Sequence, residues 1–506
     1  MRLRELVAPL EILEVRGDLD VELGGLASHS GRVLQRDVFV AVPGTNLDGH
    51  VFLKEAAARG ACAAVVERFQ DSMPGTLTQV RVSDARKALA ILAARFYGEP
   101  ARDLRMVGIT GTNGKTTTAH VLEAILGAAG HSVGILGTIA YRWGGRLLPA
   151  PNTTPDPLEL QGLLARMRQE GVSHVVMEVT SHALEQKRVL GCRFQAGIFT
   201  NLTRDHLDYH GSMEAYLAAK LSLFRDHLRD EAEGGWALLN IQDPASMAIR
   251  DACRGRVAWY GMGAGADFQA LEWKGGAEGT RIRLRFPQGE VLLESPLIGE
   301  PNVLNVVAAC GCAWGLGVGP EKWEQGLRRL SPVPGRMERI LVPGLDSGIT
   351  ALVDYAHTPD ALQRALVTAR KLARRRLIAV FGCGGDRDKG KRPMMASAAA
   401  LHCDLAVVTS DNPRSEDPRA IIDQILEGFR GTRMRRISPM ATGPTPAYTV
   451  LENREEAIRW AIGRAQDGDV VLIAGKGHET YQILRHATIP FDDREVARRA
   501  LLERGS

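Results

Sequence analysis

Short apolar runs alternate with amphipathic segments along most of the chain. The runs are rich in β-branched residues and end in glycine, proline or charge, which is typical of strands. Such runs lie within residues 37–44, 61–67, 106–118, 132–138, 174–179, 196–203, 352–360, 377–393, 405–418 and 470–482. Segments between them, such as 50–60 and 117–130, carry the apolar spacing of helices. Strands alternating with helices predict an α/β protein with mainly parallel sheets.

The length of the chain predicts more than one domain. At 506 residues it exceeds what a single hydrophobic core supports, and about three domains are expected. We predict a small N-terminal α/β domain at 1–102 and a central domain at 103–333 with a phosphate loop and a mainly parallel sheet. The third, at 334–506, has the strand-and-helix alternation of a Rossmann-like α/β domain.

Composition and charge narrow the class of protein. The 63 basic and 59 acidic residues leave a formal net charge of +4 that is spread along the chain, so no nucleic-acid-binding face is expected. No apolar run approaches the length of a membrane helix. Seven cysteines without a C-x-x-C pair argue against a disulfide framework or a zinc ribbon. These features predict a cytoplasmic protein without membrane insertion or a nucleic-acid partner.

Residues 106–118 predict a site for a nucleoside triphosphate. They form a strand, a glycine-punctuated turn and the start of a helix. Gly111 and Gly114 permit backbone N–H groups to point inward, Lys115 supplies charge for the outer phosphates, and the hydroxyl of Thr116 suits Mg²⁺. The strict phosphate-loop pattern fails because isoleucine replaces its first glycine. The context nevertheless favours an ATP or GTP site over a glycine turn before an ordinary helix.

Glu178, His206 and Lys220 each lie at the end of a predicted strand or on the segment that follows one. A glutamate and a histidine near a triphosphate suit Mg²⁺. Alone, Glu178 is typical of a helix cap or a surface carboxylate, and His206 of a polar loop residue, but the neighbouring phosphate loop favours a metal site. Lys220 lies in an apolar helical segment, where the simple prediction is that its ammonium snorkels to solvent.

Two asparagines, Asn302 and Asn305, open a well-patterned helix. They are one turn apart and can face the same ligand, although helix capping is their default interpretation.

The loops of the third domain hold several charged and polar residues that are expected at one edge of the sheet. They are Arg387, Asp411, Asn412, Arg414, Lys476, His478 and Glu479. An arginine with a glutamate is what a zwitterionic amino acid requires, because the guanidinium pairs with its carboxylate and the glutamate with its ammonium. The alternative interpretation is a set of interdomain salt bridges.

A series of motifs resembles the Mur ligases and follows their order. The motifs are GTNGKTTT, NTTP, MEVTSHAL, TNLTRDHLDYHGSMEAYLAAK, GEPNVLNVVAA, PGRMERI, DYAHTPD, GCGGDRDKGKRP, SDNPRSEDP and AGKGHETYQ. The resemblance spans nearly the whole chain and points to the branch that adds the third residue of the peptidoglycan stem peptide.

The resemblance implies an ATP-dependent, Mg²⁺-requiring reaction with UDP-N-acetylmuramoyl-L-alanyl-D-glutamate. The γ-carboxylate of its D-glutamate attacks the γ-phosphate of ATP to give an acyl phosphate, and an incoming amine then displaces phosphate. The implied ATP contacts are Gly111, Thr112, Asn113, Gly114, Lys115, Thr116, Thr117, Asn302, Asn305, Arg336 and Asp354. The catalytic residues would be Lys115, Glu178, His206 and Lys220.

The family also implies two Mg²⁺ ions. One lies near Thr116 and Glu178, and the other near His206 and Lys220. Lys220 matches a carbamylated lysine of the family, in which addition of CO₂ turns the ammonium into an anion that helps to hold the metal.

For the UDP-sugar, the resemblance implies contacts from the first two domains. These are Ser28, Ser30, Thr45, Asn46, Leu47, Asn152, Thr153, Thr154, Thr180, Gln186 and Arg188. One departure lies here: the family usually has Asp-Ser-Arg where this chain has His29, Ser30 and Gly31. The first domain would bind UDP.

The expected amine is meso-2,6-diaminopimelate. In the family the loop D-N-P-R accompanies this substrate, and lysine-adding relatives lack its arginine. The implied contacts are Arg387, Asp411, Asn412, Pro413, Arg414, Gly475 and Glu479. Diaminopimelate carries a second amino-acid head where lysine has only an ammonium, and the guanidinium of Arg414 can form a bidentate pair with its extra carboxylate. Rejection of lysine would follow from buried donors left unpaired.

Three alternatives stay open at this point. A sibling ligase, adding D-alanyl-D-alanine or lysine, shares the architecture but should lack the substrate loops described above. A folylpolyglutamate synthase shares the ligase core but lacks the sugar loops of the first domain. A non-catalytic nucleotide-binding regulator would keep the phosphate loop without Glu178, His206 and Lys220 together. We expect the protein to be a monomer.

Overall fold

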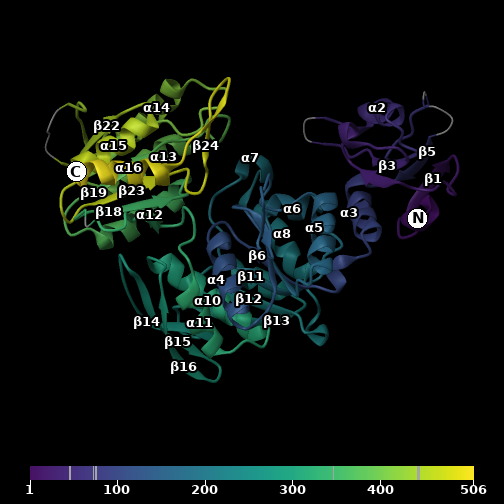
Figure 1. Cartoon of the computed structure of the whole chain (residues 1–506), viewed down its shortest axis with the longest axis horizontal. Coiled ribbons are helices and arrows are strands. Elements are labelled where there is room, and N and C mark those ends of the chain that lie inside the picture. The colour runs from purple at the N-terminus through teal and green to yellow at the C-terminus, as the bar shows by residue number, and fades with distance from the viewer. Residues whose placement is uncertain (45–46, 72, 74–76, 346, 441–444, 506) are drawn as a thin grey trace.

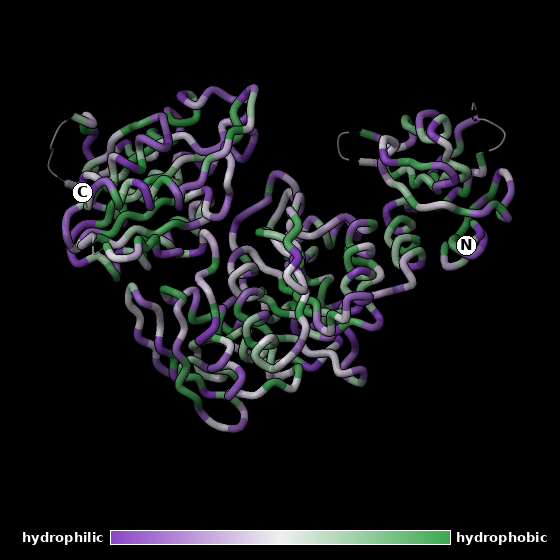
Figure 2. The backbone as a smooth tube through the Cα atoms, in the orientation of Figure 1, coloured by the Kyte–Doolittle hydropathy of each residue, from purple (hydrophilic) through white to green (hydrophobic). Residues whose placement is uncertain are grey.

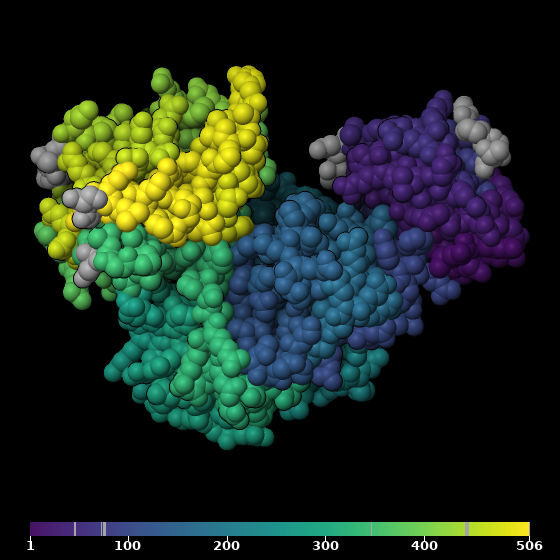
Figure 3. Space-filling model, in the orientation of Figure 1, coloured from purple at the N-terminus to yellow at the C-terminus, as the bar shows by residue number. Residues whose placement is uncertain are grey.

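The chain forms three lobes in the computed structural model, which describes residues 1–44, 47–71, 73, 77–345, 347–440 and 445–505. The first and third lobes stand on either side of the middle one, and the space-filling view shows an open hollow between them (Figures 1 and 3). Apolar positions gather along the strands of each lobe, and the outer loops are mostly polar (Figure 2).

The N-terminal lobe is a small sheet covered on both faces. Its strand order is β1 (Ile12–Arg16), β5 (Thr78–Val82), β4 (Ala63–Val66), β3 (Asp37–Val40) and β2 (Gly25–Ala27), with β1 antiparallel and the others parallel. Its helices are α1 (Leu3–Val7), α2 (Leu53–Ala58) and α3 (Ala85–Phe96). The predicted helix over 50–60 begins as a 3₁₀ turn at Gly49–Phe52 before α2.

The middle lobe is built on one large sheet with a parallel centre. Its order is β16 (Gly289–Ser295), β15 (Gly279–Phe286), β14 (Phe268–Gly276), β13 (Arg256–Gly261), β12 (Trp236–Asn240), β11 (Phe194–Phe199), β6 (Arg105–Thr110), β10 (His174–Glu178), β7 (Val133–Leu136), β8 (Tyr141–Trp143) and β9 (Arg146–Leu148). From β14 to β7 the strands are parallel, and the two margins are antiparallel. The strand β6 therefore lies between β10 and β11, and their carboxyl ends meet at one edge.

Helices cover both faces of this sheet. On one face α4 (Lys115–Ala128), α10 (Glu300–Gly315) and α11 (Pro320–Arg329) share an apolar core with Val107 and Ile109 of β6. On the other lie neighbouring short helices and α5 (Pro157–Gln169), whose Leu160 and Leu164 share an apolar core with Met106. The short helices are α6 (Ser181–Glu185), α7 (Leu207–His210), α8 (Met213–Ser222), with a π-helical turn at Leu223–His227, and α9 (Ala245–Ala252).

The C-terminal lobe is a second doubly covered sheet. Its order is β17 (Glu338–Arg339), β18 (Thr350–Asp354), β23 (Val470–Ala474), β19 (Leu377–Phe381), β20 (Leu405–Val408), β22 (Ala447–Val450) and β21 (Arg435–Arg436), with β17 antiparallel and the rest parallel. One face carries α12 (Pro359–Leu372), α13 (Lys391–His402) and α14 (Pro418–Leu426), and the other α15 (Arg454–Arg464) and α16 (Asp493–Gly505). A hairpin of β24 (Tyr481–Ile483) and β25 (Thr488–Pro490) completes the lobe. This architecture confirms the predicted α/β class with parallel-rich sheets.

Candidate functional site

A cavity of about 300 Å³ lies where the carboxyl ends of β6 and β10 meet the third lobe. We call it the first cavity. From the middle lobe its lining includes the phosphate loop from Thr112 to Thr117, with Thr138, Thr153, Glu178, Thr180, Asp205, His206, Asn302 and Asn305. From the third lobe it includes Arg336, Asp354, Tyr355, His357 and Thr358. The structure thus gathers most of the predicted nucleotide contacts, from two lobes, around one space.

The two glycines of the phosphate loop have the backbone that the motif requires. Gly111 has φ +144°, and a Cβ there would overlap Oγ1 of Thr200. Gly114, at the N-cap of α4, has φ +89°, and a Cβ there would lie 2.5 Å from Oδ1 of Asn305. Both positions need glycine for conformation and for space. Helix α4 begins at Lys115, so its N-terminal N–H groups point at the cavity.

The Lys115 side chain curls back over the loop in this structure. Its Nζ donates to the carbonyls of Gly111, at 2.8 Å, and Thr112, at 2.9 Å. Burial lowers the pKa of Lys115 below its ordinary value. The ammonium is held beside the space that the phosphate loop encloses.

The Glu178 carboxylate lies at the end of β10 with only 1% of the residue exposed. Its Oε2 accepts from Oγ1 of Thr116, at 3.0 Å, and from Oγ1 of Thr138, at 2.9 Å, while its Oε1 accepts from N of Thr138, at 2.9 Å. The alternatives of a surface carboxylate or a helix cap are therefore wrong. Carboxylate and hydroxyl oxygens meet here beside the phosphate loop.

The third lobe reaches the phosphate loop through Arg336. Its Nη2 lies 3.1 Å from Oγ1 of Thr116, and its guanidinium stacks 4.7 Å from the ring of Tyr355. Asp354, at the end of β18, accepts from N of Met337 at 2.7 Å and from N of Ala356 at 2.9 Å. Burial raises the pKa of Asp354 above its ordinary value. Both predicted residues line the first cavity.

Asn302 and Asn305 do not cap a helix, since both lie inside α10 and Gly299 occupies the N-cap. Nδ2 of Asn305 donates to Oδ1 of Asn302, at 2.9 Å, and Nδ2 of Asn302 donates to the carbonyl of Ile298, at 2.9 Å. Asn305 also accepts from Oγ1 of Thr118 in α4, at 3.3 Å. The pair links α10 to α4 at the wall of the cavity.

The side chain of Lys220 does not snorkel to solvent, so that prediction is wrong. The residue is 1% exposed, and its Nζ lies 4.3 Å from the ring centroid of Tyr216. Burial, and then the charge of Lys115, lower the pKa of Lys220 well below its ordinary value. At a given pH, a lysine with a lowered pKa is neutral more often than an exposed lysine, and the neutral amine is the form that reacts with CO₂.

His206 lines the first cavity and also a second cavity that adjoins it. It has φ +54°, and its Nε2 lies 3.4 Å from Oδ2 of Asp205. Burial lowers the pKa of His206, with the charge of Asp205 acting in the opposite direction. The neutral imidazole is the form that ligates a metal.

The oxygen donors at this site suit an Mg²⁺ ion that is also bound by phosphate oxygens. Among the described residues, no group of three or more His, Cys, Asp or Glu side chains is arranged to hold a metal by itself. Mg²⁺ is commonly bound by one or two carboxylates together with waters and substrate phosphates. Thr116 and Glu178 supply such a partial set.

A second cavity, of about 620 Å³, adjoins the first. The two share Asp205, His206, Tyr355, His357 and Thr358 as a wall, which we call the shared wall. The second cavity gathers all but one of the predicted amine contacts: Arg387, Asp411, Asn412, Arg414, Gly475 and Glu479. It also has Lys391 and Tyr481 in its lining, and α7 and β24 approach each other across it (Figure 1).

Pro413, the remaining predicted contact, is buried and its carbonyl packs against Gly385. Arg414 has φ +52° and donates from Nη1 to the carbonyl of Gly385, at 2.8 Å. Arg387 donates to the carbonyl of Asp386, at 3.0 Å. The D-N-P-R loop is therefore tied to the glycine-rich loop that follows β19.

Glu479 pairs within its own lobe, so the interdomain salt-bridge alternative fails for it. Its Oε2 lies 3.0 Å from Nζ of Lys476 and accepts from Nδ2 of Asn412, at 2.9 Å. Gly475 has φ +121°, and a Cβ there would lie 2.5 Å from Oδ2 of Asp411. Loops after β20 and β23 thus converge at this cavity.

Four of the six predicted sugar contacts of the middle lobe form one hydrogen-bonded cluster. Arg188 donates from Nη1 to the carbonyl of Thr154, at 2.9 Å, and from Nη2 to Oε1 of Gln186, at 2.8 Å. Oγ1 of Thr154 donates to the carbonyl of Glu178, at 2.8 Å, and lies 3.3 Å from Oγ1 of Thr180. Thr153 and Thr180 line the first cavity. The carbonyl of Asn152 accepts from Tyr141, at 2.5 Å.

In the first lobe the predicted contacts are only partly described. Thr45 and Asn46 lie outside the described residues, and Leu47 is exposed. Ser28 is half-buried, and Ser30 is buried and donates to Oε2 of Glu55, at 2.9 Å. At the departure from the family pattern, Nδ1 of His29 accepts from N of Gly31, at 3.1 Å. Of the described residues among them, none lines the two cavities described above.

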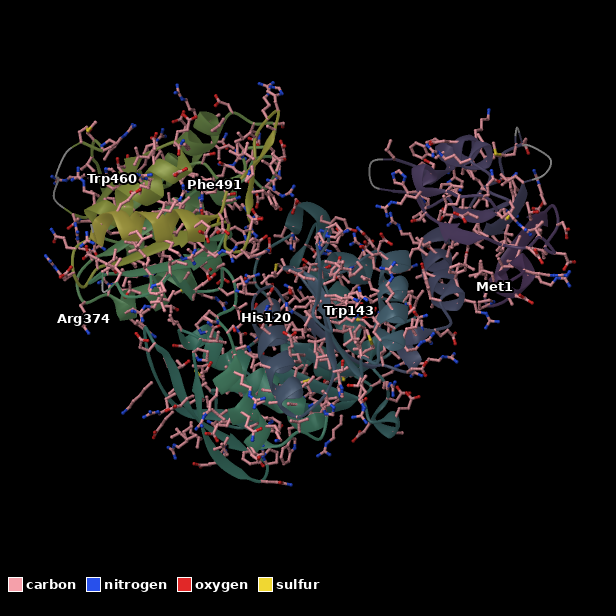
Figure 4. The ribbon with its side chains drawn as sticks, viewed as in Figure 1. Met1, His120, Trp143, Arg374, Trp460 and Phe491 are labelled. Atoms are coloured by element: carbon pink, nitrogen blue, oxygen red, sulfur yellow. The ribbon has the colours of Figure 1, made fainter. Side chains whose placement is uncertain are left out.

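Several residues in the walls escaped sequence reasoning. Thr138 follows β7 and binds Glu178, while Asp205 and His357 belong to the shared wall. Thr138 ends a predicted strand and Asp205 immediately precedes His206, so position gave a signal for these two, whereas His357 had only its place in the motif DYAHTPD. His120, labelled in Figure 4, lies one turn along α4, with Nδ1 2.9 Å from the carbonyl of Thr116, and burial lowers its pKa to about 4.

This arrangement defines a three-domain nucleotide-binding protein of the phosphate-loop class. Family models described as "Mur ligase family, catalytic domain", "Mur ligase middle domain" and "Mur ligase, glutamate ligase domain" match residues 24–97, 109–313 and 335–477. The UDP-N-acetylmuramoyl-L-alanyl-D-glutamate--2,6-diaminopimelate ligase of Geobacillus kaustophilus (strain HTA426) is 44% identical over 509 residues, covering 100% of both chains. The chain belongs to the Mur ligase family.

Solved structures support the same placement. A structure of a UDP-N-acetylmuramoyl-L-alanyl-D-glutamate--2,6-diaminopimelate ligase has a TM-score of 0.69 and 31% identity, covering 100% of this chain and 99% of its own. A folylpolyglutamate synthase of Mycobacterium tuberculosis, complexed with ADP and AMPPCP, has a TM-score of 0.62 and 18% identity and covers 77% of this chain and 92% of its own. The second likeness shows the shared fold alone.

Proposed function

We propose that this chain is an ATP-dependent ligase that adds meso-2,6-diaminopimelate to UDP-N-acetylmuramoyl-L-alanyl-D-glutamate. The observation that carries the proposal is the pair of cavities with a shared wall. One holds a phosphate loop with an acidic oxygen cluster, and the other holds Arg414 beside Glu479. A ligase of this kind needs an activated carboxylate and an amine to meet between two such sites.

The proposed chemistry assigns the first cavity to activation. A carboxylate of the D-glutamate attacks the γ-phosphate of ATP, which gives an acyl phosphate and ADP. The phosphate loop and Lys115 hold the triphosphate in line and offset the repulsion between the two anions. Arg336 and Asp354 extend this grip from the third lobe, and Asn302 and Asn305 form the wall beside α4. Mg²⁺, held by Thr116 and Glu178, would neutralise charge on the phosphates.

The second cavity would present the amine to the acyl phosphate. Arg414 and Arg387 would hold the distal carboxylate of diaminopimelate, and Glu479 and Asp411 its distal ammonium. The reacting amine would then reach past the shared wall into the first cavity and attack the acyl carbon. A tetrahedral intermediate would form and expel inorganic phosphate. Two lobes around one site exclude water from an intermediate that would otherwise hydrolyse.

We propose that Lys220 is carbamylated in the active enzyme. The support is its burial beside Tyr216 and the lowered pKa, which favours the neutral amine that CO₂ requires. The carbamate would join His206 as a ligand of a second Mg²⁺. In this proposal the sugar nucleotide reaches the site from the first lobe, over the cluster of Thr154, Gln186 and Arg188.

The setting proposed for this activity is the cytoplasm, with ATP, the sugar nucleotide and the amino acid as partners of a monomer that binds no nucleic acid. All seven cysteines are free thiols, which suits a reducing compartment. The described part of the chain contains no helix of the length and apolarity that crossing a membrane demands. The residues 1–102, 103–333 and 334–506 would be the functional domains.

The test is phosphate release by the purified protein with ATP, Mg²⁺ and UDP-N-acetylmuramoyl-L-alanyl-D-glutamate, comparing meso-diaminopimelate with L-lysine. Turnover that requires diaminopimelate is expected. Turnover with lysine alone would keep the ligase and remove the proposed amine. Turnover with neither, but with D-alanyl-D-alanine and the tripeptide precursor, would indicate a sibling ligase, and ATP binding without any turnover would indicate a regulator.

A further inference from the structure

Lys476 lies behind the wall of the second cavity and carries a charge that the proposed reaction does not use. Its side chain is 0% exposed, and the residue is not part of the cavity lining. Its Nζ lies 3.0 Å from Oδ1 of Asn412 and 3.0 Å from Oε2 of Glu479, with the ring of Tyr481 5.6 Å away. Each of these three neighbours does line the cavity.

The lysine fixes the orientation of the Asn412 amide. Oδ1 of Asn412 faces two donors, the Lys476 ammonium and N of Ile483, at 2.9 Å. Because an oxygen must face donors, Nδ2 is turned toward Glu479, to which it donates at 2.9 Å. The amide therefore presents N–H groups, rather than an oxygen, on the side of Glu479.

The lysine also occupies one oxygen of Glu479. Oε2 receives both Lys476 and Asn412, and no hydrogen bond to Oε1 is found among the described residues. A single carboxylate in such a cavity would attract any cation. With a buried ammonium 3.0 Å behind it, its field in the cavity is largely offset. Arg414 adds positive charge to the lining of the same cavity.

We propose that Lys476 is a positioning residue that sets the choice of amine. This inference rests on the proposed function. Lys476 offsets the charge of the Glu479 carboxylate, so the site takes a zwitterionic amino-acid head and disfavours a lone ammonium such as the side chain of lysine. Without Lys476 the subsite would be one charge more negative and would hold the lone ammonium better.

The test compares K476M and K476Q with the wild-type enzyme. Both remove the charge, and the glutamine keeps an N–H donor for Asn412 or Glu479. In both variants we expect the KM for meso-diaminopimelate to rise about 10-fold or more, and the inhibition constant of L-lysine to fall, while the KM for ATP stays the same. Inhibition by L-lysine is measurable even when lysine is not turned over.

A third variant reverses the sign of the change. E479Q leaves Lys476 unopposed, so inhibition by L-lysine should weaken below its wild-type level. K371M serves as a matched control, since Lys371 is half-exposed, lies on α12 of the same lobe, and pairs with Glu300 outside both cavities. Its amine selectivity should equal that of the wild-type enzyme.

An unchanged ratio of the diaminopimelate KM to the lysine inhibition constant in folded K476Q, or a loss of kcat for diaminopimelate with both of these constants unchanged, would overturn the inference and assign Lys476 a structural role only. If K476M and K476Q do not fold, an E479Q enzyme that binds L-lysine more tightly than the wild type would overturn it. These outcomes leave the proposed function intact. Absence of diaminopimelate turnover by the wild-type enzyme would instead overturn both proposals.

Discussion

Two buried lysines, one near each cavity, differ in a single respect. Lys220 is 1% exposed and lies over the ring of Tyr216, and no carboxylate of the described residues is within ion-pair distance of it. The Lys476 side chain is 0% exposed and lies 3.0 Å from the Glu479 carboxylate. Burial is thus the same and the partner is not.

The difference separates two uses of one residue type. Without a carboxylate, burial lowers the pKa of Lys220 well below its ordinary value and favours a reactive neutral amine. With a carboxylate, Lys476 forms a fixed ion pair whose hydrogen bonds align neighbouring side chains. In the two proposals above, the presence or absence of a carboxylate partner therefore decides whether a buried lysine serves chemistry or selectivity.

The largest effect is expected from replacing Lys220, the buried lysine without a carboxylate partner. K220M should lower the rate of phosphate release at least about 100-fold, because the proposed metal ligand is lost. In CO₂-free buffer the same substitution should stabilise the protein by about 1–3 kcal/mol, since methionine carries no amine to bury. Steady-state turnover and urea unfolding test the two halves. Retained activity would contradict the proposed role of Lys220 as a metal ligand. A loss of stability would contradict its description as an unpaired buried amine.

The next effect concerns the guanidinium of Arg414, which lines the second cavity. R414K should lower kcat/KM for meso-diaminopimelate about 10- to 100-fold, because an ammonium cannot form the bidentate pair with the distal carboxylate. The KM for ATP should not change, since Arg414 lies in the second cavity only. Kinetics with each substrate varied in turn provide the measurement. Wild-type kinetics with diaminopimelate would remove Arg414 from the amine site.

A third experiment breaks the ion pair between Lys476 and Glu479. K476M leaves the carboxylate of Glu479 without its buried partner and should destabilise the protein by about 3 kcal/mol. The double variant K476M/E479Q should recover at least about half of that loss, because neither charge remains. Urea unfolding of the four proteins of this cycle measures the coupling. Additive losses would mean that the pair does not act as a unit.

A smaller effect follows from the titration of Lys220. Its pKa is lowered in the folded state, so between that value and the ordinary one near 10.4 the unfolded chain binds more protons. Stability must then rise with pH across this window, by at most about 1.4 kcal/mol per pH unit, and the contribution is complete above the unfolded pKa. The wild-type protein in CO₂-free buffer should show this rise relative to K220M. If the free energies of unfolding of the two proteins change with pH in the same way, the lowered pKa of Lys220 would be contradicted.

The smallest change is expected at an exposed lysine. The Lys371 ammonium lies 3.2 Å from Glu300, and both side chains are about half exposed. K371M should therefore alter the free energy of unfolding by no more than about 0.5 kcal/mol. Thermal unfolding tests this. A loss comparable to that of K476M would show that burial does not govern the comparison.

Local patterns were sufficient to predict the phosphate loop and the position of Glu178. A strand followed by glycines and a helix start determines where the phosphate loop lies, and a glutamate at a neighbouring strand end must share its edge of the sheet. The grouping of Arg414 with Glu479 followed from the same rule, because both come directly after parallel strands.

The environment of Lys220 could not be derived from periodicity. Its segment is apolar on several sides, and whether another element covers the ammonium depends on contacts distant in sequence. The same holds for the hydrogen bond from Arg336 to Thr116, which joins two lobes. It also holds for Asp205, which lines a cavity formed between the two lobes. These contacts depend on residues far apart in the sequence, so local patterns could not predict them.

The shared wall has a mechanical consequence. Asp205 and His206 come from the middle lobe, while Tyr355, His357 and Thr358 come from the third. A partition made by two bodies cannot stay fixed when they rotate against each other, so any such rotation reshapes both compartments at once. A molecule that binds in one compartment and favours one relative position of the two lobes would therefore also change the shape of the other compartment.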